Sequence, residues 1–249
     1  MTLPTLPVVA LTLGDPAGIG PELIARLLAQ PRITHAANIV LVGDAWLWEK
    51  GQKIAGQPVA TQPLRSFADA RSRAVTHLPA FLPLDTVAPA QVQRGQAQAP
   101  GGASVLQVLN ACMDAAQRKE IDAICFAPLN KFAMKQGGLQ HEDELHHFAQ
   151  YLGVTGYFCE FNTLGDLWTA RVSSHIPLKD AASYLSKARI KDATRLIYRS
   201  LQAGNIGHAQ SDPIWWEVAG TVYPVYASGS SCPLLGTVTD LANHDLYIS

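Results

Sequence analysis

The order of hydrophobic and polar positions along the chain predicts alternating strands and helices. Strands are predicted from short, nearly continuous apolar runs at residues 7–13, 38–42 and 122–128. Apolar residues at helical spacing predict helices at residues 21–28, 103–118, 131–136, 142–152 and 187–202. The repeated order of strand, turn and helix predicts parallel strands joined by helical crossovers. We therefore expect an α/β fold.

Two segments depart from this alternation. Residues 62–100 are rich in proline, alanine and glutamine with weak periodicity, and we interpret them as a peripheral excursion of uncertain structure. From residue 207 the composition shifts to serine, threonine, glycine, proline and tryptophan, and the last fifty residues contain no lysine or arginine. We therefore predict an α/β domain over residues 1–206 and a divergent or irregular tail over residues 207–249.

Composition and charge narrow the classes of protein to consider. The 249 residues are 48% hydrophobic and 16% charged, which is enough apolar material for a globular core. A net charge of −1 provides no long-range attraction to nucleic acid, so we expect no nucleic-acid partner. The four cysteines form no CxxC pair, and no apolar run approaches the length of about 20 residues that spans a bilayer. We expect a cytoplasmic protein with reduced thiols and no membrane contact.

The sharpest local signal is the glycine-rich turn between the first predicted strand and helix, Gly14-Asp15-Pro16-Ala17-Gly18-Ile19-Gly20-Pro21-Glu22. Glycine permits positive φ, and proline suits the first helical turn because it lacks an N–H. The free N–H groups of a helix N-terminus favour a phosphate or carboxylate, which makes Gly18 and Gly20 candidate substrate-binding residues. The alternative is a tight connection that binds no ligand.

The segment TLGDPAGIGPELIARLL closely resembles the N-terminal signature of the 4-hydroxythreonine-4-phosphate dehydrogenase family. Residues 127–131 resemble its Gly-Pro-x-x-Lys element, with alanine in place of glycine, and residues 174–180 resemble its Thr-His-(Leu/Ile)-Pro-Leu segment. The resemblance covers about residues 7–203. It implies a three-layer α/β/α fold of the isocitrate/isopropylmalate dehydrogenase-like type with an incomplete second lobe. It also implies a homodimer whose active site takes residues from both subunits.

The resemblance further implies an NAD-dependent oxidoreductase of pyridoxine biosynthesis. Members of the family oxidise a secondary alcohol on a phosphorylated hydroxy acid, and the β-keto acid then loses CO₂. A divalent metal held by three histidines polarises the alcohol and ketone oxygens. The substrate expected here is 4-phosphohydroxy-threonine or a related 4-phospho-sugar acid, and the cofactors are NAD and a metal such as zinc or magnesium.

Carried over by position, His175 matches the first metal-binding histidine; its alternative is a hydrogen-bonded structural histidine. The family's His-Thr substrate pair falls within residues 140–147, where the match is poor. Counting from Lys131 without gaps reaches Glu144, a short deletion reaches His141 instead, and the threonine is absent either way. This departure suggests a paralogous substrate preference rather than the vitamin B6 intermediate itself.

The histidines and carboxylates of this segment are candidates for substrate binding and proton transfer, namely His141, Asp143 and Glu144. Their alternative is an exposed, acidic first helical turn. Lys131 either contacts a substrate anion, as a catalytic-site residue, or is solvated at the start of its helix.

The family's second and third metal-binding segments are not recognisable in this sequence. His208 and His244 have different surroundings, and no basic residue follows to neutralise a phosphate. We therefore expect a shortened family member whose end arose by frameshift or divergence. The alternative function is that of a catalytically incomplete member that binds a phosphate ligand or another subunit.

Overall fold

A computed structural model describes residues 6–72, 77–164, 167–173, 176–203, 214–218 and 221–225. The chain divides into two compact units, Met1–Val154 and Thr155–Ser249, and each is described by itself. The predicted division into an α/β domain over residues 1–206 and a tail over residues 207–249 stays a prediction.

The first unit is built on a five-stranded sheet in the order β3-β4-β2-β1-β5, in which every pair is parallel. Its strands are β1 (Val8–Thr12), β2 (Asn38–Gly43), β3 (Gln62–Pro63), β4 (Ala80–Pro83) and β5 (Ala123–Phe126). Val9 of β1 lies opposite Ile39 of β2 and Ala123 of β5. The apolar runs that predicted β1 and β2 belong to buried strands of a parallel sheet, as expected, whereas β5 is an edge strand whose residues are mostly exposed.

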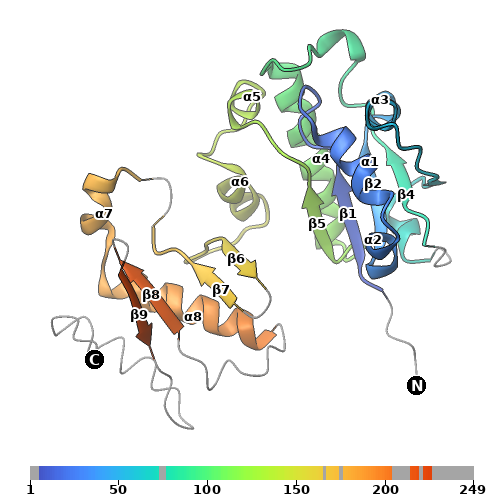
Figure 1. Ribbon diagram of the computed structural model, residues 1–249. Coiled ribbons are helices and arrows are strands. Elements are labelled where there is room, and N and C mark those ends of the chain that lie inside the picture. Colours follow the sequence, from blue (N-terminus) through green and yellow to red (C-terminus); the bar gives the residue numbers. More distant parts are fainter. Residues whose placement is uncertain are drawn as a thin grey trace, which may run out of the picture. The chain divides into compact units, whose positions relative to one another are not determined.

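Helices cover both faces of this sheet (Figure 1). The helices of the first unit are α1 (Gly20–Leu28), α2 (Pro31–Ala36), α3 (Ala45–Ala55), α4 (Ala99–Gln117), α5 (Lys131–Gln136) and α6 (Glu144–Tyr151). Ile39 and Leu41 of β2 pack with side chains of α1 and α3, whereas Val40 and Val42 pack with side chains of α4. Because successive side chains of a strand point to opposite faces, one strand serves both cores. The predicted three-layer α/β/α arrangement is confirmed.

The interpretation of residues 62–100 as a peripheral excursion is wrong. The segment contains β3, two short 3-10 helices and β4, which pairs with β2 inside the sheet. Ala80 is 0% exposed and Leu82 is 5% exposed. β4 has only four residues, with Pro79 before it and Pro83 as its last residue, so its apolar pattern is too short for a periodicity search over about 11 residues.

The second unit contains a pair of antiparallel strands, β6 (Phe161–Leu164) and β7 (Leu167–Ala170), followed by α7 (Leu178–Tyr184) and α8 (Lys187–Ala203). α8 confirms the long helix predicted over residues 187–202. Two further antiparallel strands, β8 (Ile214–Val218) and β9 (Thr221–Val225), lie where the composition indicated irregular structure. Across both units, the described helices include none that combines the length and apolar character of a membrane span.

Two glycines allow the backbones of α4 and α5 to lie in direct contact. A Cβ added at Gly102 of α4 would overlap the carbonyl oxygen of Ala133, and one added at Gly137 would overlap the backbone of residues 102–103. Side chains of α4, α5 and α6 close the space around this contact, including Leu109, Met134 and Phe148. Because these two glycines have no side chains, the backbone of α5 can pack directly against that of α4.

We predict that Gly102→Ala lowers the free energy of unfolding by about 1–3 kcal/mol, because the new methyl group cannot fit without moving a helix. Gly101→Ala is the matched control in the same helical turn. Its Cβ would make ordinary contact with Asp15 Oδ1 at 3.4 Å, so better helix propensity should leave the variant equally stable or more stable by up to about 1 kcal/mol. Urea unfolding followed by circular dichroism measures both. Equal stabilities for the two variants would contradict the close contact.

Candidate functional site

The glycine-rich turn packs directly on the connection between β5 and α5. Gly14 has φ of 72°, and a Cβ there would lie 2.6 Å from the carbonyl oxygen of Pro128. The same oxygen accepts a hydrogen bond of 3.1 Å from the backbone N–H of Asp15. A Cβ at Gly20 would overlap the carbonyl oxygen of Leu13. Packing of the chain on itself is therefore sufficient to explain the glycines at positions 14 and 20.

Gly18 lies on a surface groove rather than in this contact. The groove is lined by Pro16, Gly18, Pro21, Glu22, Leu47, Lys50, Gly51, Ile54 and Arg94. Arg94 Nη2 is 2.7 Å from Glu22 Oε2, so the guanidinium charge is already balanced. Lys50 lies with its Nζ 5.8 Å from the centre of the Trp46 ring. The predicted roles of Gly18 and Gly20 in substrate binding stay predictions.

Asp15 is a buried carboxylic acid within the turn, and sequence reasoning did not single it out. It is 6% exposed, and its Oδ1 accepts a 2.9 Å hydrogen bond from the backbone N–H of Ala17. Burial raises the pKa of Asp15, and the hydrogen bond from Ala17 only partly opposes this. An aspartate that bonds to the backbone two residues on is typical of turns, which is the signal that could have identified it.

The turn lies at the point where the sheet reverses its strand order. β1 has β2 on one side and β5 on the other, and the chain reaches β5 only after β4 and α4. The glycine-rich turn follows the carboxyl end of β1, and residues 127–131 follow the carboxyl end of β5. Ligands of open α/β sheets bind outside the carboxyl ends of the strands at such a point. The fold thus brings together two motifs that are more than 100 residues apart.

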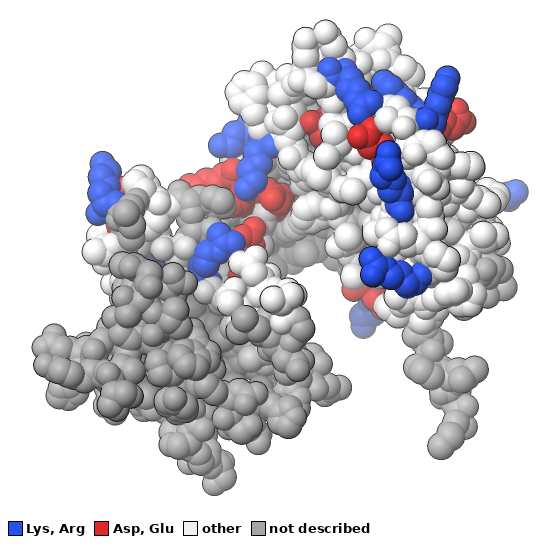
Figure 2. Space-filling view, in the orientation of Figure 1, with Lys and Arg blue, Asp and Glu red and all other residues white. Residues whose placement is uncertain are grey.

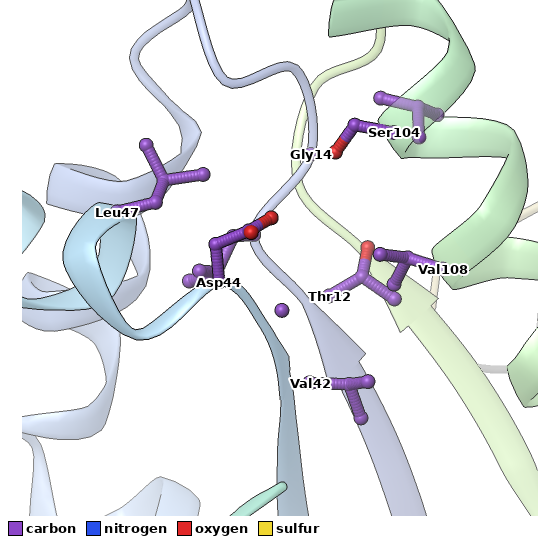
Figure 3. Close-up of a pocket in the computed structure, with 10 residues that line it drawn as sticks. Thr12, Gly14, Val42, Asp44, Leu47, Ser104 and Val108 are labelled. Carbon is purple, nitrogen blue, oxygen red and sulfur yellow. The ribbon is translucent and has the colours of Figure 1, made fainter. Parts of the chain in front are cut away.

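A small pocket lies beside the turn, between the carboxyl ends of β1 and β2 (Figure 3). Thr12, Asp44 and Ser104 present oxygen atoms to it, and its volume of about 10 Å³ suits about one water molecule. Asp44 accepts hydrogen bonds from Thr86 N at 3.0 Å, Thr86 Oγ1 at 2.6 Å and Val87 N at 3.2 Å. This pocket is too small for a phosphorylated acid, and Asp44 instead connects the end of β2 to the segment between β4 and α4.

The predicted catalytic and substrate-binding side chains gather where α5 and α6 begin. We define the α5–α6 cluster as Lys131, His141, Asp143, Glu144, His146 and His147. α5 is capped by Asn130, whose side chain accepts a 3.0 Å hydrogen bond from Ala133 N. α6 is capped by Asp143, whose Oδ1 accepts a 2.9 Å hydrogen bond from His146 N. Lys131 Nζ lies 3.6 Å from Glu144 Oε2, which links the two helix starts.

Asp143 is held as a carboxylate. It is 4% exposed, and its Oδ1 also lies 2.7 Å from His146 Nδ1. Burial acts to raise the pKa of Asp143, but the hydrogen bonds from His146 and the positive charges of His146 and Lys131 outweigh it and lower the pKa. The carboxylate thus caps α6, and its predicted contact with substrate stays a prediction.

Glu144 has an unsatisfied oxygen. Among the described residues, its Oε2 is the buried side-chain atom without a hydrogen-bond partner, and the ammonium of Lys131 lies just beyond hydrogen-bond distance at 3.6 Å. Leaving a buried carboxylate oxygen without a hydrogen bond is costly, so native proteins rarely do so away from functional positions. Lys131 itself is 45% exposed at its side chain and thus accessible to a ligand. The ion pair with Lys131 thus balances the charge of Glu144 but leaves Oε2 without a hydrogen bond.

Two histidines complete the cluster. The rings of His141 and His147 lie with centroids 6.0 Å apart, and His147 Nε2 lies 2.8 Å from Asn110 Oδ1 on α4. Burial lowers the pKa of His147, and the charge of His141 lowers it further. His141 was predicted as a site residue, whereas the pairing of His147 with Asn110 was not, because no local pattern connects two residues so far apart in the chain.

The predicted metal ligand His175 lies outside the described residues, so its role stays a prediction. Within the part of the chain that the structure describes, no group of three His, Cys, Asp or Glu side chains is arranged to hold a metal ion. The described residues therefore do not by themselves make up a metal site.

Charged side chains are dispersed over the face shown in Figure 2. Lysine and arginine side chains lie apart from one another there, separated by uncharged surface, and several adjoin acidic side chains. Four of the ion pairs join arginine to aspartate or glutamate at 2.7–3.5 Å, at Arg71–Asp122, Arg94–Glu22, Arg118–Glu120 and Arg171–Glu160. These arginines are therefore balanced by local ion pairs.

Comparison with known proteins identifies the family to which these features belong. The family model described as pyridoxal phosphate biosynthetic protein PdxA matches residues 35–211. A relative named "Putative 4-hydroxythreonine-4-phosphate dehydrogenase" in Pasteurella multocida is 43% identical over 197 residues. A relative named "Putative 4-hydroxythreonine-4-phosphate dehydrogenase 2" in Pseudomonas aeruginosa is 41% identical over 211 residues. These matches cover 79% and 83% of this chain, but 58% and 60% of the relatives. The chain thus spans about three fifths of the length of these relatives.

A further relative and a solved structure agree. D-threonate 4-phosphate dehydrogenase of Bordetella bronchiseptica is 32% identical over 196 residues, covering 77% of this chain and 54% of that protein. The crystal structure of 4-hydroxythreonine-4-phosphate dehydrogenase from Klebsiella pneumoniae matches with a TM-score of 0.69 and 26% identity, over 80% of this chain and 60% of that one. The expected fold of the isocitrate/isopropylmalate dehydrogenase-like type is confirmed by this likeness. The chain therefore belongs to the PdxA family of pyridoxal phosphate biosynthetic proteins.

Proposed function

We propose that this chain provides part of an NAD-dependent, metal-assisted dehydrogenase that acts on a phosphorylated hydroxy acid. The names of the relatives support two substrates, 4-hydroxythreonine 4-phosphate and D-threonate 4-phosphate. The structural observation that carries the proposal is the unsatisfied Glu144 oxygen beside the exposed ammonium of Lys131. Both lie on helices that follow β5 in the chain, and residues 127–128, just before Lys131, pack on the glycine-rich turn.

Lys131 and Glu144 would bind the substrate in complementary ways. The ammonium of Lys131 contacts an anionic group of the acid, which gains a charge-assisted hydrogen bond. Displacing Lys131 from its 3.6 Å pairing leaves Glu144 Oε2 free to accept a hydrogen bond from a substrate hydroxyl. His141 contributes an imidazole that would contact the substrate beside His147. Asp143 caps the start of α6.

The cofactors belong to the proposal as well. NAD would supply the hydride acceptor for the alcohol carbon, and a divalent metal such as zinc or magnesium would supply a Lewis acid for the alcohol oxygen. His175 would be one metal ligand, as the motif resemblance implies. We also propose that the active protein is a cytoplasmic homodimer.

The direct test follows NADH formation by the full chain with 4-hydroxythreonine 4-phosphate or D-threonate 4-phosphate, in the presence of zinc, magnesium or manganese. We expect turnover with at least one of these acids. Calorimetry with each acid, with NAD and with metal accompanies the assay. Binding of a phosphorylated acid without turnover under any of these conditions would refute the dehydrogenase proposal and favour a non-catalytic phosphate-binding protein.

We predict that Lys131→Gln weakens binding of the phosphorylated acid about tenfold or more, because a charge-assisted hydrogen bond is worth about 1.5–3 kcal/mol. Lys135→Gln is the matched control, since it removes an exposed lysine from the last turn of the same helix. Calorimetric dissociation constants of the two variants give the comparison. An unchanged affinity in Lys131→Gln would place this lysine outside the substrate site.

We predict that the imidazole of His147 titrates below the ordinary value of 6.5 and is neutral at neutral pH. His141→Asn should raise the pKa of His147, because it removes a repelling charge, but should leave it below 6.5 because burial is the larger cause. The ring signals of His147 in an NMR titration report this pKa. His35→Asn, on α2, serves as the control and should leave the titration of His147 unchanged.

A further inference from the structure

We propose that Asn110 is a positioning residue that holds His147 as the Nε2–H tautomer and so makes its Nδ1 the proton acceptor of the α5–α6 cluster. The role of His147 as a proton acceptor rests on the proposed function. The role of Asn110 in positioning His147 is independent of it, because that role concerns only the contact between α4 and α6.

The geometry places Asn110 at the centre of the contact between α4 and α6. His147 Nε2 lies 2.8 Å from Asn110 Oδ1, and one helical turn further along both helices, Tyr151 donates a 2.8 Å hydrogen bond to Asp114 Oδ1. Residues four apart lie on the same face of a helix, so the two bonds form a ladder. Phe148 packs against the apolar cluster that contains Leu106 and Leu109 of α4, which keeps the ladder in register.

The identity of the paired atoms determines where the proton of His147 lies. An amide oxygen has lone pairs and no hydrogen, so His147 Nε2 must donate to it. A neutral imidazole carries a single N–H, and its Nδ1 therefore has a free lone pair. His147 is also partly buried, and that disfavours the doubly protonated ring.

The charged and titratable groups around His147 come from all the elements that pack near it. They are His141 in the preceding loop, Asp143 and Tyr151 on its own helix, Asp114 on α4, and the Lys131–Glu144 pair between α5 and α6. Asn110 is the uncharged hydrogen-bond partner in this set. A neutral partner fixes the tautomer without stabilising the imidazolium, whereas a carboxylate at the same position would do both.

An acceptor of this kind fits the oxidation of a secondary alcohol. The alcohol carbon loses a hydride to the oxidised nicotinamide of NAD, and the hydroxyl group loses its proton as the carbonyl forms. Nδ1 of a neutral histidine takes that proton and becomes imidazolium, which later releases it to water. The hydride and the proton thus both have acceptors within the proposed reaction.

Heteronuclear NMR of His147 in the full chain tests the positioning role directly. We expect Nε2 to be protonated and Nδ1 unprotonated in the native chain at neutral pH. Asn110→Asp keeps the shape of the side chain and adds a negative charge, so it should raise the pKa of His147 by about 1–2 units. Asp114→Asn is the matched control, because it weakens the neighbouring rung of the ladder and should leave the His147 tautomer unchanged.

The predominance of the Nδ1–H tautomer in the native chain, or an unchanged pKa in Asn110→Asp, would overturn the positioning role. The acceptor role is tested by the dependence of kcat/KM on pH, whose acidic limb should move upward in Asn110→Asp together with the pKa of His147. An active variant whose acidic limb stays in place would overturn the acceptor role. If the native chain has no turnover at all, the proposed function fails, and the NMR result still decides the positioning role.

Discussion

The site depends on the backbone contact between the glycine-rich turn and the end of β5. The Asp15 N–H donates to the Pro128 carbonyl oxygen at 3.1 Å, and Gly14 reaches that oxygen so closely that a side chain would not fit. Because β1 and β5 are neighbouring parallel strands, this contact lies at the sheet edge where open α/β folds bind ligands. It also sets the direction in which the chain leaves β5 and enters α5, and thus the position of Lys131.

The two neighbouring carboxylates of the α5–α6 cluster, Asp143 and Glu144, differ in their hydrogen bonding. Asp143 is satisfied by the start of α6 and is thereby kept ionised, which is the ordinary task of a helix cap. Glu144, one residue further on, has a buried oxygen without a hydrogen bond and a lysine close by. Buried polar groups are normally satisfied, and this oxygen is the observation on which the proposed substrate contact rests.

The family match and the packing of the glycine-rich turn are separate observations on different parts of the first unit. The family model matches residues 35–211, whereas the glycine-rich turn lies before that range. The strand reversal and the packing of the turn on residues 127–128 nevertheless tie the turn to the matched region. The family's threonine is absent from residues 140–147, and the local alternatives His141 and Glu144 both belong to the cluster. Which of the two takes the role of the family's histidine stays a prediction.

Local patterns in the sequence were sufficient to predict the central strands and the longer helices of the first unit and the long helix of the second. Apolar runs and helical spacing located β1, β2, β5, α4, α5 and α8, because burial of one face leaves its period in the sequence. The sequence placed Lys131 at the start of α5 and the acidic residues near the start of α6, because capping residues act within a few positions. Only the tertiary structure brought β4 into the sheet and Asn110 into contact with His147. These features join residues about 40 positions apart in the chain, and short-range periodicity carries no information about contacts over that separation.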